Sequence, residues 1–380
     1  MIVTRLKGNV GVSLNKETKR MAQIQFGNDP AKIVKYLRFW NREDVKRPLV
    51  GFSLVGWFPM EEFAVCQRWE AAEFLTPEMV EPQDFMDDHV RLAREGEVVN
   101  DDIIRGACPT QVTVPFLPAM LGNPLRVLPQ NILGDERKLS WEEAFAVNLE
   151  AADPWYLKYM AFIDALVERA AGRFPVSHGP EIGPTDLHAI LRGHNESIMD
   201  LMDEPERSAK LLWHLGEIVR DMFEAIWRWI PLFHDGYFDA QYCLWSPGPI
   251  IRIQEDATAV YSPDLYRRLV QPVDRMLAAA FSCSFMHLHS TSMFLLDAFL
   301  EIEELSCFQI NNDAIGPPVA DMVPYFQKVQ KAGRSLLIRG SFTPEEMRLL
   351  MDALAPRGLF LNIMVKRMEE VDALKPILGM

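Results

Sequence analysis

The residues with the clearest chemical use are two histidines in the word MHLHST, His287 and His289. Side chains alternate along a strand, so residues two positions apart point to the same side. Imidazole is a common metal ligand and carries protons near neutral pH. We therefore expect a site in which His289, nearer the strand end, is central, while a hydrogen-bonded core histidine is an equal interpretation of His287.

Carboxylates lie near the ends of two other predicted strands. Asp313 comes after two asparagines, whereas Asp101 and Asp102 are neighbours, so only one of that pair can face a given substrate. A carboxylate whose pKa is set by burial can act as a general acid or base. We expect Asp313 and Asp102 to be catalytic; the alternatives are a loop cap for Asp313 and a solvated loop for the Asp101-Asp102 pair.

Other side chains at strand ends are expected to bind the substrate, because the carboxyl ends of parallel strands converge on one cavity. In this set the aromatic rings would form a wall and the arginine would hold an anionic group. The word QED at residues 254–256 adds two loop carboxylates, which suit substrate or metal binding or are plain surface charge. The expected substrate-binding residues are Phe52, Trp57, His178, Tyr242, Trp245, Asn312, Arg339 and Asn362.

The elements that must position these residues are short apolar runs alternating with longer amphipathic helices, which is typical of an α/β protein. The runs number eight, as a closed (β/α)8 TIM barrel requires. We expect this barrel over residues 47–380, after a helical N-terminal extension at 1–46, with an insertion at 107–157 after the second strand. The predicted strands are 48–54, 97–104, 174–179, 237–244, 285–289, 307–311, 335–339 and 358–363.

Helix starts are marked by capping residues. Ser140 and Thr343 each precede a glutamate by three positions, the spacing of a capping box. Ser262 before a proline predicts a helix at residues 262–281. Apolar residues at three- and four-residue steps predict a long helix over 204–230.

Composition excludes several classes of protein. The 380 residues are 49% hydrophobic and carry a formal net charge of -14, which argues against a nucleic-acid partner. Five scattered cysteines form no CxxC pair and fit a reducing compartment. No signal peptide or apolar run of membrane-spanning length is present, so we expect a cytoplasmic protein without a membrane partner. The motifs GxSxG, GxxxxGK[ST] and HExxH are absent too.

Five words along the chain, in this order and spacing, resemble the uroporphyrinogen decarboxylase superfamily. This barrel family includes that decarboxylase and corrinoid-linked methyltransferases. The words are RPLV at 47–50, GPTDLHAILRG at 183–193, QEDATAVYSPDLYRRLVQP at 254–272, MHLHST at 286–291 and GLFLNIMV at 358–365.

The resemblance to the decarboxylase itself is partial. Its arginine-containing word after the first strand is replaced by SLVGW at 53–57, and the GHG word after its last strand by MVK at 364–366. Its essential aspartate is matched loosely by Asp101 or Asp102, and its last-strand asparagine by Asn362. Without the arginines, and at this net charge, a polyanionic porphyrinogen is a poor substrate.

The methyltransferase branch holds zinc with an H-x-C word on the fifth strand and a later cysteine. Here the histidine is matched by His289, the cysteine position is Thr291, and no cysteine follows Cys307. Imidazole and carboxylate oxygen are also zinc ligands, so the resemblance implies a harder site of His289 with His287 and Glu255, or with Asp313.

Three functions follow from the resemblance. The first is methyl transfer on a small molecule, to or from a corrinoid carried by a partner protein and with zinc as the metal. The second is decarboxylation of an acidic substrate with no cofactor, in which Asp313 or Asp102 stabilises a protonated intermediate. The third is a non-catalytic small-molecule binding role. A homodimer is compatible with all three.

Overall fold

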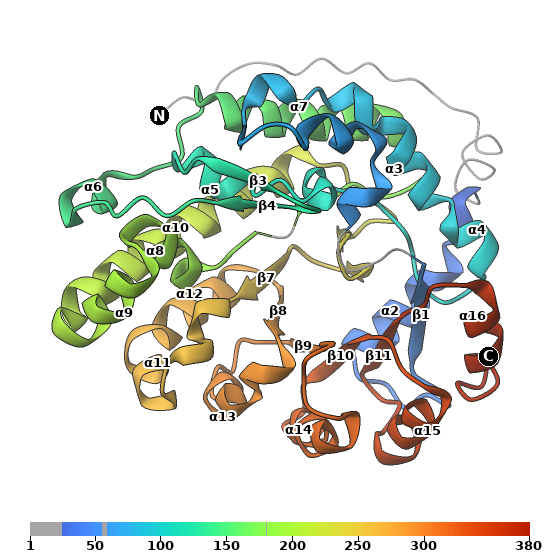
Figure 1. The fold of residues 1–380 in the computed structure, drawn as a ribbon. Helices are drawn as coiled ribbons and strands as arrows, with labels where there is room; N and C mark the ends of the chain where they lie inside the picture. Colours follow the sequence, from blue (N-terminus) through green and yellow to red (C-terminus); the bar gives the residue numbers. More distant parts are fainter. Residues whose placement is uncertain (1–24, 55–58, 180) are drawn as a thin grey trace.

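A sheet of six parallel strands, in the order β1-β11-β10-β9-β8-β7, forms the centre of the molecule (Figure 1). The structure, a computed structural model, describes residues 25–54, 59–179 and 181–380. The strands are buried along almost their whole length, as in a parallel sheet that is covered on both faces. They are β1 Leu49–Ser53, β7 Ile250–Gln254, β8 Cys283–Leu288, β9 Cys307–Asn312, β10 Ser335–Gly340 and β11 Leu359–Met364.

Beyond β1 the sheet is followed by extended segments with few regular hydrogen bonds. Asp102 N donates to Val50 O over 3.0 Å, and Ala107 forms an isolated parallel bridge with Val176. Ser177 N then donates to Ala107 O over 2.9 Å. The structure thus confirms an α/β chain with a mostly parallel sheet, in which the described part of the chain contributes six regular parallel strands rather than the eight that the barrel prediction requires.

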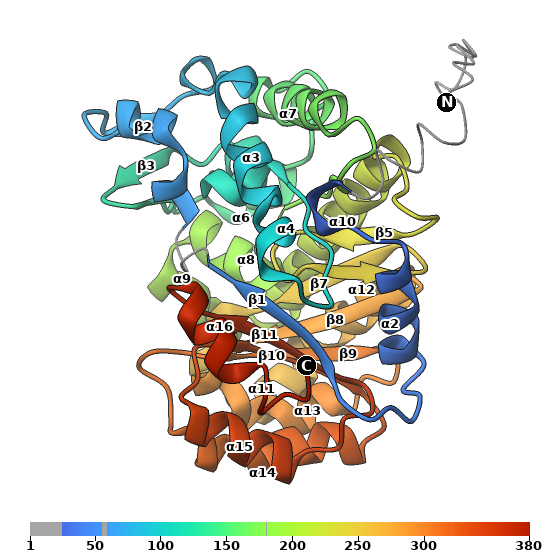
Figure 2. The ribbon, with the colours of Figure 1, turned by 90° about the vertical axis from the view of Figure 1, so that its right-hand side faces the viewer.

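The helices that follow the strands lie along the outer face of the sheet (Figures 1 and 2). Helix α12 packs on β7 and β8, and α14 packs on β10. The longest, α10, buries the apolar stripe that the sequence predicts. These helices are α8 Pro184–Arg192, α9 His194–Asp203, α10 Pro205–Trp229, α11 Pro263–Leu269, α12 Gln271–Ala280, α13 Leu296–Leu300, α14 Val319–Lys331, α15 Pro344–Ala353 and α16 Met368–Leu374.

The N-terminal helix α2, Ala31–Trp40, lies beside the end of the sheet at which β1 begins, and α16 lies at the opposite end (Figure 2). Tyr36 OH donates to Cys243 O over 2.6 Å, and Trp40 Nε1 donates to Trp245 O over 2.8 Å. These bonds join the N-terminal extension to β6, Leu244–Ser246, and to the turn before it.

The segment between β1 and the extended stretch at Val176 forms a separate layer, at the top of Figure 1. It contains a small antiparallel sheet in the order β2-β3-β4. Arg137 N donates to Ile190 O over 2.8 Å, which ties this layer to α8. Its elements are β2 Phe74–Leu75, α3 Met86–Ala93, α4 Glu95–Val99, α5 Phe116–Met120, β3 Leu125–Leu128, β4 Asn131–Gly134, α6 Trp141–Ala146 and α7 Pro154–Ala170.

Five of the eight predicted strands are confirmed as β1, β8, β9, β10 and β11. The strand predicted at 97–104 is wrong, because its first residues belong to α4. The strand predicted at 174–179 forms only the bridge at Val176. The strand predicted at 237–244 is an antiparallel hairpin of β5, Tyr237–Asp239, and β6. The strand β7 was not predicted.

The predicted helix starts are confirmed. Ser140 and Thr343 both form complete capping boxes, and Ser262 Oγ accepts a hydrogen bond from Leu265 N. The helix predicted from Ser262 divides into α11 and α12, and the break precedes Pro272, whose ring cannot continue an uninterrupted helix. In the described ranges no helix combines the length and apolar character that a membrane span needs.

Candidate functional site

One face of the parallel sheet carries a polar row near the carboxyl ends of the strands. Residues that are aligned in a parallel sheet point to the same face. The register aligns Gln254 with His287 and His287 with Gln309. It also aligns Arg339 with both Asn311 and Asn362. All six belong to one face by strand alternation, and all but the half-buried Gln254 are buried.

His287 is held with one ring nitrogen available. Its Nδ1 lies 2.9 Å from Tyr242 OH and is also hydrogen-bonded to Gln309 Oε1. Gln309 Nε2 donates to Asn311 Oδ1 over 2.8 Å, which fixes the orientation of the amide. An amide oxygen only accepts, so Nδ1 carries the proton and Nε2 of neutral His287 keeps a lone pair.

His289 is oriented by a carboxylate. Its Nδ1 lies 3.0 Å from Asp313 Oδ1, and the other oxygen of Asp313 accepts from Ser290 N over 2.7 Å and from Ser290 Oγ over 2.9 Å. Here Ser290 begins the short helix η8, Ser290–Leu295. The opposite nitrogen, His289 Nε2, lies 3.8 Å from Asp256 Oδ1. Asp313 therefore fixes the ring that faces Asp256.

Asp256, His287 and His289 form a cluster of three side chains that could hold a metal ion. One ligand atom from each lies within 4.8 Å of the others. A tetrahedral zinc ion at about 2.1 Å from each donor would separate them by about 3.4 Å, so small side-chain rotations close the site. Two imidazoles and one carboxylate are an established ligand set for zinc and for iron. The residues present therefore fit a metal ion, and we call them the histidine cluster.

Access and orientation also suit a metal site. The side chains of His289 and Asp256 are 41% and 37% exposed, so an ion and a substrate can reach them. Asp256 is the first residue of the short helix η7, Asp256–Val260, and its Oδ2 accepts a hydrogen bond from Gln254 Nε2. Metal-binding histidines usually donate their other ring N–H to a carboxylate or carbonyl oxygen. Asp313 and Gln309 supply that support here.

The pKa values of the two histidines in the cluster are shifted in opposite directions. Burial lowers the pKa of His287 to about 4, so its ring is neutral at pH 7. The hydrogen bond to Asp313 raises the pKa of His289, although partial burial opposes this. Burial of Asp313 also opposes ionisation, but hydrogen bonds from His289 and Ser290 outweigh it and lower its pKa to about 2. Asp313 is therefore an ionised carboxylate whose role is to hold His289.

Glu255, expected as a metal ligand, points elsewhere. Its Oε2 accepts hydrogen bonds from Thr185 N over 2.9 Å and from Thr185 Oγ1. Burial, and then the nearby Asp274 and Asp186, raise its pKa well above the usual range. The neighbouring Asp256 faces the histidines instead. The prediction chose the wrong carboxylate of the QED word, because the bonds that orient Glu255 come from a segment 70 residues earlier.

Asp102, expected to be catalytic, lies at the amino end of the sheet. It accepts hydrogen bonds from Lys35 Nζ over 2.5 Å, from Arg47 and from Val50 N over 3.1 Å. Burial opposes its ionisation, but the bonds from Arg47 and Lys35 lower its pKa. It lines a cavity of about 460 Å³ that also includes Leu49, at the start of β1. Asp102 therefore stabilises the fold rather than joining the histidines.

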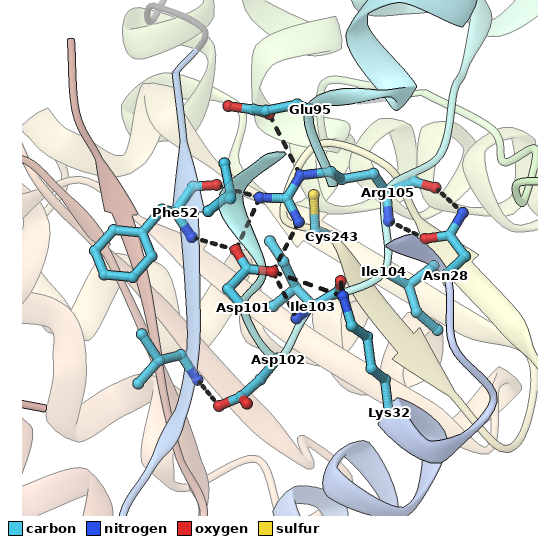
Figure 3. Close-up of polar contacts among 12 residues, drawn as sticks. Asn28, Lys32, Phe52, Glu95, Asp101, Asp102, Ile103, Ile104, Arg105 and Cys243 are labelled. Atoms are coloured by element: carbon cyan, nitrogen blue, oxygen red, sulfur yellow. Dashed lines mark hydrogen bonds and ion pairs between the residues drawn. The ribbon is translucent and has the colours of Figure 1, made fainter. Parts of the chain in front are cut away.

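Its neighbour Asp101 belongs to a buried ion-pair network beside β1 (Figure 3). Both oxygens of Asp101 accept from the guanidinium of Arg105 at 2.8 Å, and Arg105 also lies 3.4 Å from Glu95. Arg105 NH2 donates to Phe52 O over 2.6 Å, while Phe52 N donates to Asp101 over 2.9 Å. We call these residues, with Asn28 and Lys32, the Arg105 network.

Four expected substrate-binding residues lie away from the polar row or outside the described residues. Phe52 belongs to the opposite face of β1, since its neighbours Gly51 and Ser53 are aligned with Asn362 and Met364. His178 packs against Phe223 and Trp227 of α10, with its ring centre 4.1 and 4.7 Å from theirs. Trp245 donates to Phe233 O and packs near α2. Trp57 lies outside the described residues.

Of the remaining four residues, three lie with the polar row and one does not. Tyr242, Arg339 and Asn362 lie with the polar row, and Asn362 Nδ2 donates to Tyr242 O over 2.9 Å. Asn312 belongs to the opposite face of β9 and donates to Ser341 O over 2.9 Å. The structure thus brings Tyr242, Arg339 and Asn362 close to His287, and directs Asn312 to the neighbouring loop.

Sequence reasoning missed Gln309 and Arg252 as site residues, and of the two carboxylates in the QED word it selected Glu255 rather than Asp256 as the metal ligand. The signal for Gln309 and Arg252 was present. Arg252 and Gln254 occupy alternate positions in the apolar run IIRIQ, and Gln309 and Asn311 do so in CFQIN. Polar residues at every second position of a buried strand indicate a polar interior face. For Asp256 the sequence shows only that it shares a loop with Glu255.

Among solved structures, the chain is similar to a methyltransferase from Methanosarcina mazei. The superposition has a TM-score of 0.61 and covers 93% of this chain and 98% of that chain, at 14% sequence identity. At this identity the likeness concerns the fold. No protein-family model and no curated protein sequence matches the chain.

Proposed function

We propose that this chain is a metal-dependent methyltransferase related to the uroporphyrinogen decarboxylase superfamily, with its metal held by the histidine cluster. The observation that carries the proposal is the convergence of Asp256, His287 and His289, whose ligand atoms lie within 4.8 Å of one another. The fold shared with a methyltransferase over 93% of the chain supports it. We further propose that the six strands and the extended segments beyond β1 together form the eight positions of a TIM barrel.

The spacing of the histidines also supports this proposal. The family word H-x-C places two ligands two residues apart on one strand, and His287 and His289 have that spacing. Thr291, which the resemblance places at the cysteine position, lies within η8 and is exposed. The histidine pair then replaces the histidine and cysteine of the word. Asp256, after β7, supplies the third ligand in place of the late cysteine.

In this mechanism each side chain has a separate task. A bound metal would supply the Lewis acidity that makes the acceptor group lose its proton more easily. His287 and His289 would bind it through Nε2, and Asp256 through a carboxylate oxygen. Gln309 keeps the proton of His287 on Nδ1, and Asp313 holds the ring of His289. The acceptor then forms a bond to the methyl carbon as the bond between that carbon and its donor breaks.

We propose zinc as the metal, a small molecule as the acceptor, and a corrinoid carried by a partner protein as the methyl donor. Decarboxylation by an unassisted carboxylate has less support in the geometry. Asp102 is bound to Lys35 and Arg47, and Asp313 to His289 and Ser290, so neither carboxylate stands free beside the polar row.

Elemental analysis of the purified full chain tests the proposal. We expect about one zinc per chain after incubation with zinc and desalting, and loss of that zinc in the variant His289→Ala. The matched control is His194→Ala, because His194 is an exposed histidine paired with Glu136. The rate at which the chain demethylates a free methylated corrinoid, measured by the corrinoid's absorbance, should fall when the metal is lost. A wild-type chain that retains no metal would refute the proposal.

A further inference from the structure

The start of α8 lies against the loop that carries Asp256. The word GPTD at 183–186 supplies the beginning of this helix, and QEDA at 254–257 joins the end of β7 to η7. Asp186 and Asp256 are 70 residues apart in the sequence, yet α8 and η7 are in contact in the fold. The proposed function uses Asp256 alone from these two words, so the contacts between them still need a reason.

Gly183, the residue before α8, permits an unusually close approach to this loop. A Cβ atom at this position would lie 1.8 Å from Gln254 O, a backbone atom, and 2.6 Å from Glu255 Oε1. Non-bonded atoms do not pack at such distances. A residue without a side chain is therefore required here, and the first turn of α8 lies directly on the backbone of the loop.

The first turn of α8 binds three consecutive residues of the loop. Thr185 donates to Glu255 Oε2 through both its backbone N and its Oγ1. Asp186 Oδ2 accepts a hydrogen bond from Asp256 N over 3.2 Å, and Asp186 Oδ1 accepts one from Ala257 N over 2.8 Å. Both oxygens of the Asp186 carboxylate are thus bonded to adjacent amides of the loop.

These two amides open the short helix η7. The first amides of a helix find no acceptor within the helix and need one from elsewhere. The N-cap residue, Glu255, bonds through its side chain to Thr185 and leaves these amides to another group. A single helical turn is not stable in water by itself. Asp186 therefore fixes the start of η7 from a different helix.

The start of η7 decides where the carboxylate of Asp256 points. Gln254 Nε2 donates to Asp256 Oδ2, while Asp256 Oδ1 lies 3.8 Å from His289 Nε2. Metal ligands must be held within roughly 0.5 Å of the binding geometry. The two histidines come from the end of β8, whereas Asp256 belongs to a short helix of five residues. Its position depends most on contacts from outside.

We propose that Asp186 is a positioning residue of the metal site: by binding the amides of Asp256 and Ala257, it directs the Asp256 carboxylate towards the histidines. The inference rests on the proposed function and adds a residue that acts on the metal only through Asp256. Thr185 assists by holding the Glu255 side chain away from the histidine cluster. Loss of Asp186 should then weaken metal binding while the rest of the fold is kept.

Amide hydrogen exchange of the full chain, without added metal, tests the hydrogen bonds of Asp186. We expect Asp186→Ala to raise the exchange rate of the peptide at 254–260 about tenfold, because two of its amides lose their acceptor. Peptides from α16 should exchange as in the wild type. The matched control is Asp264→Ala, since Asp264 is an exposed aspartate in the first turn of α11.

Zinc affinity, measured by competition with a fluorescent chelator, tests the effect on the cluster. Partners that orient metal ligands typically contribute 10- to 100-fold to affinity, so we expect Asp186→Ala to lower it by about that factor. Asp186→Asn keeps the shape of the side chain and one acceptor oxygen, and should lose less. Urea unfolding shows whether each variant is folded.

A double variant separates positioning from a general loss of structure. Two changes that act through the same group do not add. In the background Asp256→Ala, the further change Asp186→Ala should therefore alter zinc affinity by less than about twofold. A purely structural role would lower the affinity equally in both backgrounds.

The outcomes distinguish this inference from the proposed function. Unchanged exchange at 254–260 in Asp186→Ala overturns the inference, whether or not the chain binds zinc. Faster exchange with wild-type zinc affinity overturns it too, as does an equal loss of affinity in the Asp256→Ala background. A wild-type chain that retains no zinc refutes the proposed function, while faster exchange in Asp186→Ala would still support the control of Asp256 by Asp186.

Discussion

The Arg105 network and the histidine cluster are both built from ionisable side chains on or beside parallel-sheet segments, yet their bonding differs. In the Arg105 network every oxygen of Asp101 is bonded to Arg105 or to a backbone amide, and Arg105 contacts two carboxylates and a carbonyl oxygen. In the histidine cluster, each ring is fixed through Nδ1, so that Nε2 stays available. Buried ionisable side chains therefore indicate a functional site only where some of their donor or acceptor atoms remain available for a ligand.

The largest expected effect is the loss of stability when the Arg105 network is disrupted. Arg105→Met removes the guanidinium and leaves Asp101 as a buried carboxylate without its main partner. Loss of one member of a buried ion pair typically costs about 3–5 kcal/mol. We expect urea unfolding to show a loss of stability of this size, with metal binding unchanged in the protein that stays folded. The exposed Arg228→Met should cost less than about 1 kcal/mol.

A loss of stability below about 1 kcal/mol for Arg105→Met would show that the network contributes little. Impaired zinc binding in the folded variant would show that the two regions are coupled. Either result would remove the distinction drawn between them.

The next effect concerns the metal affinity of the histidine cluster. Asp313→Asn keeps the shape of the side chain but replaces the ionised acceptor of His289. Outer partners of metal ligands typically contribute 10- to 100-fold to metal affinity. We expect zinc affinity, measured by competition with a fluorescent chelator, to fall by about that factor with little change in unfolding. Asp297→Asn, at an exposed ion pair with Lys328, is the control. Equal zinc affinity in wild type and Asp313→Asn would argue against the support assigned to Asp313.

A third prediction uses Glu181, whose Oε2 accepts from Leu117 N over 3.2 Å. Burial raises its pKa to about 8 from a usual 4.5. The folded chain therefore keeps a proton that the unfolded chain releases above pH 4.5, so this contribution to stability is full below that pH and is lost as the pH rises towards 8. The loss is up to about 1.4 kcal/mol per pH unit.

Glu181→Gln should remove this dependence. We expect the free energy of unfolding of the wild type to decline more steeply between pH 5 and pH 8 than that of the variant. Buried histidines such as His178 titrate in both proteins and cancel in the difference. Parallel curves would show that Glu181 does not hold its proton in the folded chain.

The smallest expected effect is at the amino end of the sheet. Lys35→Met removes one of the two cations bound to Asp102, but the Lys35 side chain is 42% exposed and Arg47 remains. Partly exposed ion pairs are typically worth about 0.2–1 kcal/mol. We expect a stability loss in this range, by urea unfolding. A loss comparable to that of Arg105→Met would show that Lys35 contributes as much to stability as Arg105 does.

Much of the fold is predictable from local pattern. The strands β8 to β11 are short, mostly apolar runs, and the capping boxes at Ser140 and Thr343 depend on residues three positions apart. The strand β7 has a similar pattern in the run IIRIQ, but the strand of this region was predicted at 237–244 instead. The error at 97–104 arises because the apolar residues there are compatible with both a strand and the helix α4.

The candidate site is predictable only where strand periodicity decides it. Alternation places His287 and His289 on one side, and the structure brings Asp313 to His289. The choice between Glu255 and Asp256 depends on Thr185, and the position of Asp102 depends on Lys35 and Arg47. Such long-range contacts leave no periodic trace in the sequence.

The pairing of β1 with β11 also bears on how the chain folds as it is made. The register aligns Val50 with Leu361, so the first strand of the sheet finds its neighbour only when the last strand has been synthesised. At about 5–20 residues per second, roughly 15–60 s separate the two strands on the ribosome. Until then, β1 has an exposed edge that can pair with another chain. A circular permutant that begins in the loop after β10 would place β11 and β1 close together in the sequence and should shorten that interval.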